Sequence, residues 1–423
     1  MRRWRGLKAL VHDAIDATTA LVAEGHDSAA RSVLRVTDHV PAVAAPAREI
    51  DDVRRLSTDG VLGTVRALNR AVAVVTDAGL DVTEQIQRRS ASRREAPLGA
   101  RLVPMRSDRT RSWEWVGDAA LGAVNGVIGD RLHARGNGLD LGMTLRIGDA
   151  YAEPVASSAA VADAKLAVFV HGLATTEWSW CLDAETRLGD PGANFGTMLA
   201  RDLGYTPVFV RYNTGRPIAD NGRALDDALD GFVSRCPSPI EEILLVGHSL
   251  GGLVLRSACH SATEKERPWV RRVRHVFCLG SPHRGAPLEK IGFALTRMLA
   301  SVDLPGTLVP ARILERRSAG IRDLRHGLDG GDLDDVPLLA HASYHFVHAT
   351  VTEDVAHPVG TVVGDLLVRT ASASGPRAGS VAAVTTTHLG GVLHHQLQSH
   401  PAVYELIRRS CADRSPEPST PDE

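Results

Sequence analysis

The chain has few aromatic residues, few cysteines and no long uninterrupted apolar run. Phenylalanine, tryptophan and tyrosine make up 4% of its 423 residues, so we expect no extended stacking surface for bases or sugars. A net charge of −2 gives no electrostatic reason to expect a nucleic-acid partner. The five cysteines are odd in number and show no Cys-x-x-Cys spacing, which argues against a metal cluster or a disulfide framework.

The sequence also lacks the apolar segments that direct a chain to or through a membrane. No stretch reaches the roughly 18 apolar residues of a membrane span. His12, Asp13, Asp16 and Glu24 interrupt the start of the chain, so we expect no secretory signal and a cytoplasmic protein. The basic residues at positions 2, 3, 5 and 8, beside Trp4, allow a weak peripheral membrane contact as the alternative to a plain helical cap.

The pattern of apolar residues divides the chain into two regions. Residues 1–150 carry apolar residues at helical spacing and predict an α-helical N-terminal region, with a linker near 88–110. Residues 160–410 alternate strand-like and helical runs, which predicts an α/β domain with a mostly parallel sheet. The expected strands lie at 166–170, 206–211, 243–246, 273–279 and 344–351.

The alternation stops between 288 and 339, where we expect an inserted cap or lid. This insertion is apolar enough to favour an acyl chain over a polar substrate. Glycines recur along the helical stretch 113–132, which predicts close packing against a neighbour. Residues 411–423 are expected to be a disordered tail.

The most informative motif is Gly-His-Ser-Leu-Gly at 247–251, which follows the apolar run 242–246. A strand, a sharp turn and a helix with this pattern form a nucleophile elbow that exposes the serine hydroxyl. We therefore expect Ser249 to be a nucleophile. The backbone N–H of Leu250 and that of Leu173, which follows His-Gly at the end of strand 166–170, are the expected oxyanion donors.

A serine nucleophile needs a base and an orienting acid, which follow it along the chain in this type of fold. Asp365 is the predicted acid because apolar residues surround it, with Asp354 as the competitor. His394 is the predicted base because it lies on a loop just before the last helical run, with His388 as the alternative.

Four segments resemble bacterial lipases and esterases of the triacylglycerol-lipase and GPI-inositol-deacylase-like branch. They lie at 171–173, 247–252, 279–287 and 364–368, within a resemblance that covers roughly residues 160–410. The resemblance implies an α/β-hydrolase fold, and residues 391–394 are similar to the family's catalytic-histidine loop. That similarity favours His394 over His388.

The predicted reaction is hydrolysis of a small acyl ester or lipid ester through an acyl-serine, without a metal or an organic cofactor. A thioesterase or an acyltransferase would use the same residues. From another class, a non-catalytic scaffold or membrane-associated protein is the alternative. The sequence does not specify the oligomeric state.

Overall fold

The computed structural model describes most of the chain beyond residue 103. The described residues are 6, 9, 104–109, 113–148, 150–151, 164–283, 285, 318–326, 336–354, 365, 368 and 383–412. Residues 1–103 other than 6 and 9, most of the predicted linker and cap, and residues 413–423 of the predicted tail lie outside them. The predicted start of the tail at 411 is wrong, because residues 411–412 belong to the helix Pro401–Ala412. Contacts divide the chain into two units, residues 1–98 with 136–139 and residues 99–135 with 140–423.

The second unit is built on a single mixed sheet whose strands run β2-β1-β4-β3-β5-β6-β7-β8 across it. From β4 to β8 all neighbours are parallel, and β1 pairs antiparallel with both β2 and β4. The strands are β1 (Met143–Ile147), β2 (Ala150–Tyr151), β3 (Lys165–Val170), β4 (Thr206–Tyr212), β5 (Glu242–His248), β6 (Val273–Leu279), β7 (Ser343–Thr350) and β8 (Ala383–Gly390).

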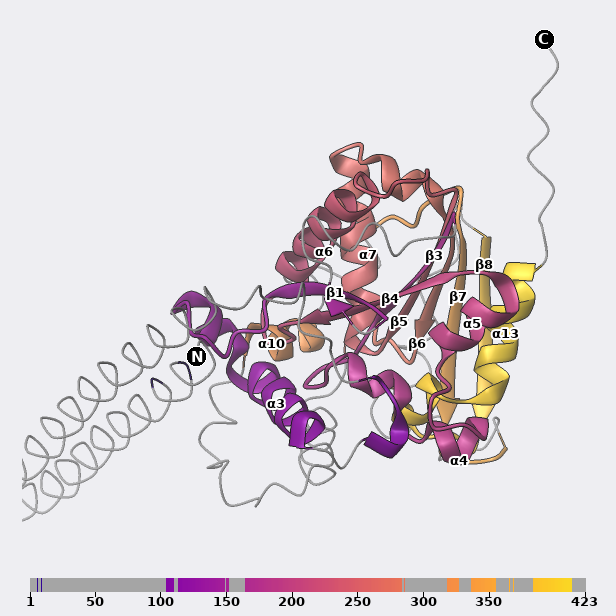
Figure 1. Cartoon of the computed structure of the whole chain (residues 1–423), viewed down its shortest axis with the longest axis horizontal. Helices are drawn as coiled ribbons and strands as arrows, with labels where there is room; N and C mark the ends of the chain where they lie inside the picture. Colours follow the sequence, from indigo (N-terminus) through magenta and orange to yellow (C-terminus); the bar gives the residue numbers. More distant parts are fainter. Residues whose placement is uncertain are drawn as a thin grey trace, which may run out of the picture. The chain divides into compact units, whose positions relative to one another are not determined.

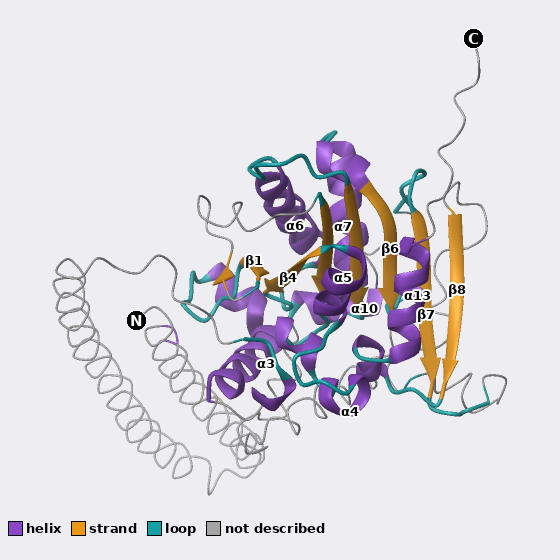
Figure 2. Ribbon diagram, turned by 45° about the vertical axis from the view of Figure 1, so that its right-hand side comes forward, coloured by secondary structure: helices purple, strands orange, loops and turns teal. Residues whose placement is uncertain are grey.

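The helices cover both faces of this sheet (Figures 1 and 2). Helices α6 and α7 lie together on one face, and α5 and α13 lie on the other. The helices are α3 (Trp113–Ala134), α4 (Ala184–Leu188), α5 (Phe195–Leu203), α6 (Ile218–Val233), α7 (Leu250–Glu264), α10 (Ala319–His326) and α13 (Pro401–Ala412). Short 3-10 helices are η1 (Ser107–Arg109), η3 (Glu177–Cys181), η4 (Pro268–Arg272) and η8 (His394–Gln398).

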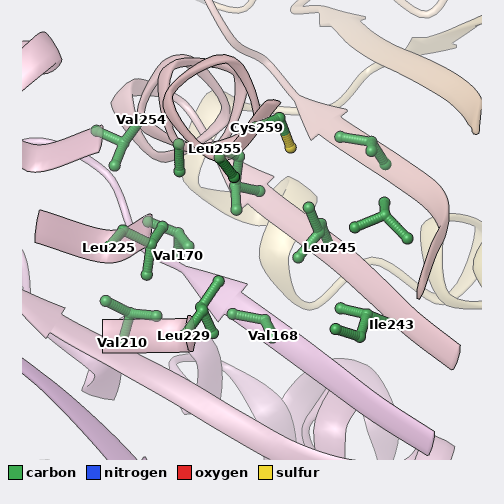
Figure 3. Close-up of a cluster of buried hydrophobic side chains, with 14 of the residues drawn as sticks. Val168, Val170, Val210, Leu225, Leu229, Ile243, Leu245, Val254, Leu255 and Cys259 are labelled. Carbon is green, nitrogen blue, oxygen red and sulfur yellow. The ribbon is translucent and has the colours of Figure 1, made fainter. Parts of the chain in front are cut away.

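The two faces of the sheet carry separate hydrophobic clusters. Along β3, Val168 and Val170 enter the cluster under α6 and α7, whereas Ala167 and Phe169 enter the cluster under α5 and α13. All four side chains are fully buried, because a parallel strand covered on both faces needs apolar residues at successive positions. Figure 3 shows the first cluster, with residues of β3, β4 and β5 against α6 and α7.

Local signals in the sequence fix where individual helices begin and end. Helix α5 starts at a capping box, in which Asn194 Oδ1 accepts from Thr197 N at 2.9 Å and Thr197 Oγ1 accepts from Asn194 N at 3.0 Å. It ends at Gly204, whose φ of 69° is the left-handed conformation that glycine adopts without strain. These caps hold α5 on the face that also carries α13.

The expected parallel strands are all present, and three further strands join them. β1 and β2 lie within residues 143–151, where the sequence analysis expected helix for all but the last residue. β1 is a strand because it pairs with β4 over five successive residue pairs, a long-range contact that overrides local spacing. β8, at the edge of the sheet, was also not foreseen, and its side chains are exposed or half-buried.

Within the described part of the chain, no helix is both long enough and apolar enough to cross a lipid bilayer. Of the predicted cap, the described residues include α10 and residues 336–339.

Candidate active site

Ser249 lies in a sharp turn between β5 and α7. Its backbone has φ 53° and ψ −122°, a conformation that is costly for a residue with a side chain. Its N–H donates to the carbonyl of Leu279 at the end of β6, with an N···O distance of 2.8 Å. The residue is half-buried, so the turn presents its side chain at the carboxyl end of the sheet.

The glycines that flank Ser249 are required by space. A Cβ at Gly247 would lie 2.5 Å from the backbone nitrogen of Gly252, and one at Gly251 would lie 2.2 Å from the carbonyl oxygen of Val170. Both neighbours are backbone atoms that cannot rotate away. The Gly-x-Ser-x-Gly pattern therefore follows from the packing of the turn against α7 and β3.

Asp365 and His394 form a buried pair. His394 Nδ1 donates to Asp365 Oδ2 at 2.7 Å, and His394 N donates to the Asp365 carbonyl at 3.3 Å. The other carboxylate oxygen accepts from Val368 N at 2.8 Å. With a proton on Nδ1, the neutral ring carries its lone pair on Nε2. That nitrogen is buried and has no hydrogen-bond partner among the described groups.

His394 and Ser249 meet at the carboxyl end of β6. Gly280, with φ 61°, lies against the imidazole, since a Cβ there would be 3.0 Å from both Cε1 and Nδ1 of His394. The preceding residue, Leu279, accepts the Ser249 N–H. The serine turn and the histidine ring thus pack on two adjacent residues, although no hydrogen bond joins Ser249 Oγ to His394 Nε2.

The loop after β3 passes beside the serine. A Cβ at Gly172 would lie 3.1 Å from Ser249 Cβ. The Gly172 carbonyl accepts from Thr175 Oγ1 at 2.8 Å, and the His171 carbonyl accepts from Tyr212 Oη at 2.8 Å. Both carbonyls are therefore engaged by hydroxyl groups. The structure thus brings the Gly172–Leu173 peptide close to Ser249.

Leu250 is the first residue of α7, where backbone N–H groups have no partner within the helix. It directly follows Ser249, and the next residue, Gly251, lies against the loop after β3, since a Cβ there would be 2.6 Å from the carbonyl oxygen of His171. The positive end of the α7 dipole lies at the same place. The backbone N–H groups at the start of α7 would therefore stabilise a negative charge that forms next to Ser249.

The alternatives Asp354 and His388 lie in different surroundings from Asp365 and His394. Asp354 is exposed in the bend at 351–354, whereas Asp365 is hydrogen-bonded to His394. His388 Nε2 lies 3.1 Å from Thr350 Oγ1, and its ring packs on His348 with centroids 4.4 Å apart. The geometry therefore pairs Asp365 with His394.

His248 is a neighbour of the pair to which sequence reasoning gave no role. Its Nε2 donates to the carbonyl of His394 at 3.0 Å, and the two ring centroids are 4.7 Å apart. Burial, and then the proximity of His394, hold the pKa of His248 well below its usual range. A neutral His248 thus fixes the His394 backbone without adding charge.

A buried cluster of charged groups lies behind the loop after β3. Arg211 Nε donates to Glu177 Oε2 at 2.6 Å, and its Nη2 donates to Asp118 Oδ2 at 2.7 Å. Burial lowers the pKa of Arg211, but the carboxylates of Glu177 and Asp118 outweigh burial and raise that pKa.

Among the described residues, no group of three His, Cys, Asp or Glu side chains has the geometry to hold a metal ion.

Comparison with known proteins identifies relatives of part of the chain. Residues 212–302 match the PGAP1-like alpha/beta domain family, and this segment contains Ser249. No curated protein matches the chain.

Several solved structures are similar in fold, at low identity. The mature lipase BlEst2 of Bacillus licheniformis is 20% identical, with 58% of this chain and 91% of that chain covered and a TM-score of 0.40. Phospholipase PlaB from Legionella pneumophila is 16% identical, with 60% and 61% covered and a TM-score of 0.39. The Staphylococcus hyicus lipase is 12% identical, with 59% and 95% covered and a TM-score of 0.37.

Proposed function

We propose that this chain is an α/β hydrolase of the lipase and esterase branch that cleaves carboxylic esters through an acyl-serine intermediate. In this proposal Ser249 is the nucleophile, His394 the general base and Asp365 the residue that orients His394. The backbone N–H groups of Leu173 and Leu250 form the oxyanion hole. The substrate is a small acyl ester or a lipid ester.

One observation carries the proposal. His394 donates through Nδ1 to a buried carboxylate at 2.7 Å, which leaves Nε2 unpartnered among the described groups. The same ring packs on Gly280, next to the residue that accepts the N–H of the strained Ser249. A base with a free lone pair close to a serine side chain is the arrangement that nucleophilic catalysis by serine requires.

Acylation follows from these positions. Ser249 Oγ attacks the ester carbonyl carbon while His394 Nε2 takes the hydroxyl proton. The negative charge that forms on the carbonyl oxygen is stabilised by the N–H groups of Leu173 and Leu250, each worth about 10²–10³ in turnover. His394 then gives its proton to the departing alcohol as the C–O bond breaks.

Deacylation uses the same groups with water in place of the serine. His394 Nε2 takes a proton from water, the hydroxide attacks the acyl carbon, and Ser249 Oγ leaves with the proton. The Asp365 carboxylate stabilises the imidazolium that forms in each half-reaction. His248, 4.7 Å away between ring centroids, stays neutral and so does not oppose that charge.

The proposal is tested with p-nitrophenyl acetate, butyrate, octanoate and palmitate and the full-length chain. We expect serine-dependent turnover that Ser249→Ala lowers by about 10⁴-fold or more, without a change in the melting temperature. Turnover that Ser249→Ala retains would refute the mechanism. A preference for the long esters would assign a lipase, and a preference for the short ones an esterase.

Two related activities are outcomes of the same assay. Faster turnover of an acyl thioester than of the matched ester would assign a thioesterase. A rise in product release when a primary alcohol is added, with formation of its ester, would assign an acyltransferase, because the alcohol then competes with water for the acyl-serine.

A further inference from the structure

Helix α3 packs directly on the loop that follows β3. A Cβ at Gly126 would lie 2.6 Å from the Cβ of Ala174 and 2.8 Å from its Cα. One turn earlier, a Cβ at Gly122 would lie 2.9 Å from the carbonyl carbon and oxygen of Thr175. The helix therefore approaches the backbone of residues 174–175 so closely that only glycine fits at these two positions.

The loop that α3 contacts contains a residue with a strained backbone conformation. Ala174 has a φ of 60°, which is unfavourable for a residue with a Cβ. Its N–H donates to Thr214 Oγ1 at 3.0 Å. Ala174 directly follows Leu173, so its strained backbone sets the direction of the Leu173 peptide beside Ser249.

Two further contacts hold α3 in this place. Arg211 on β4 bonds both Asp118 on α3 and Glu177, at 2.7 and 2.6 Å, and Glu177 begins η3 just after the loop. Ser318 Oγ, directly before α10, donates to the carbonyl of Gly126 at 2.7 Å. Figure 1 shows α10 beside α3.

We infer that α3 positions the loop after β3, which carries the proposed oxyanion donor at Leu173. Gly126 and Asp118 are then positioning residues for that donor. This inference rests on the proposed function. The helix lies outside residues 212–302, the segment matched by the PGAP1-like family.

The direct test compares the same substitution at two glycines of α3. Gly126→Ala places a methyl group against the Ala174 backbone, whereas Gly117→Ala places one on an exposed position. Both variants are assayed for kcat and KM with p-nitrophenyl butyrate, for the rate of inactivation by a fluorophosphonate, and for melting temperature.

We expect Gly126→Ala to lower kcat by about ten- to a hundredfold with little change in KM, because a small displacement of an oxyanion donor weakens transition-state binding. Inactivation by the fluorophosphonate should slow with it, since its phosphoryl oxygen uses the same donors. Gly117→Ala should match the wild type in all these measurements. A folded Gly126→Ala chain with wild-type kcat and inactivation rate would overturn the inference.

A second variant keeps the test decisive if Gly126→Ala does not fold. Asp118→Asn keeps the shape of the side chain and weakens the bond from α3 to Arg211, so it should lower kcat in the same direction but less. Unchanged kcat in Asp118→Asn would then overturn the inference. Turnover that is equal in the wild type and in Ser249→Ala would instead refute the proposed function. The failure of the inference and the failure of the proposed function are therefore distinguishable.

Discussion

The tautomer of His394 follows from the bond between its ring and Asp365. Asp365 Oδ2, a carboxylate oxygen, lies 2.7 Å from Nδ1, so that nitrogen carries the proton. The Val368 N–H bonds the second carboxylate oxygen at 2.8 Å and prevents its rotation. The tautomer with a basic Nε2 is therefore selected by the fold before any substrate binds.

Replacing Asp365 tests this selection at the scale of one residue. Asp365→Asn should lower kcat by about 10⁴-fold, because an amide permits the wrong tautomer of His394. The matched control is Asp354→Asn, on the exposed bend, which should retain wild-type kcat. Kinetics with p-nitrophenyl butyrate decide between them, and equal losses in both variants would contradict the assignment of the acid.

His248 offers a second test at this scale. His248→Phe keeps a ring beside His394 and removes the donor to the His394 carbonyl. The loss of one buried hydrogen bond, about 0.5–1.5 kcal/mol, should lower kcat by up to about tenfold and leave KM nearly unchanged. His248→Gln, which retains a donor, should recover part of the loss. A fully active phenylalanine variant would show that the bond does not position His394.

Individual residues were predictable where the signal is local. Ser249 stands in a motif that its strained turn requires. The chain order of acid and base pointed to Asp365 and His394, which are hydrogen-bonded to each other, and their catalytic roles stay a prediction. The role of His248 was not predictable, because its acceptor lies 146 residues further along the chain. The contact of Glu177 was not predictable either, because its partner Arg211 lies 34 residues further along the chain.

Elements were predictable in proportion to their burial. β3 and β5 are covered on both faces and appear in the sequence as continuous apolar runs, and the second half of β6, residues 276–279, does the same. β8 lies at the edge, so its sequence, Ala-Val-Thr-Thr-Thr-His-Leu-Gly, carries no such run. The glycines of α3 did predict close packing, and three of them lie against backbone or side-chain atoms of other elements.

The ion pairs of Arg211 test how α3, β4 and η3 are joined. Arg211→Leu would leave Glu177 buried and without its principal cation, which should lower the free energy of unfolding by about 3–5 kcal/mol. The control is Arg223→Ala, which removes the exposed ion pair to Asp220 on α6 and should change stability little. Urea unfolding measures both, and similar stabilities for the two variants would contradict the structural role.

For the whole molecule, buried histidines make stability depend on pH. Burial, aided by His275, lowers the pKa of His345 to about 4, and burial lowers the pKa of His171 to about 3. Unfolded histidines bind a proton below about pH 6.5, so between these limits the unfolded chain holds more protons. The free energy of unfolding therefore falls as the pH decreases from about 6.5 toward 4.

His345→Phe should flatten this dependence. The ring of His345 stacks on Phe277 with centroids 4.2 Å apart, so phenylalanine fits the same space. One histidine contributes at most about 1.4 kcal/mol per pH unit in this window. Urea unfolding at about pH 5, inside the window, and at about pH 7, above it, should show a smaller difference in the free energy of unfolding for the variant than for the wild type. His260→Gln, on the exposed side of α7, is the control and should leave the dependence unchanged. An identical dependence in the phenylalanine variant would contradict the assignment.

Covalent labelling of the full-length chain by a fluorophosphonate, followed by peptide mass spectrometry, tests whether Ser249 is the nucleophile. We expect one adduct, on the peptide that contains Ser249, with no labelling in Ser249→Ala and much slower labelling in His394→Ala. An adduct on another serine, or equal labelling of wild type and Ser249→Ala, would contradict it.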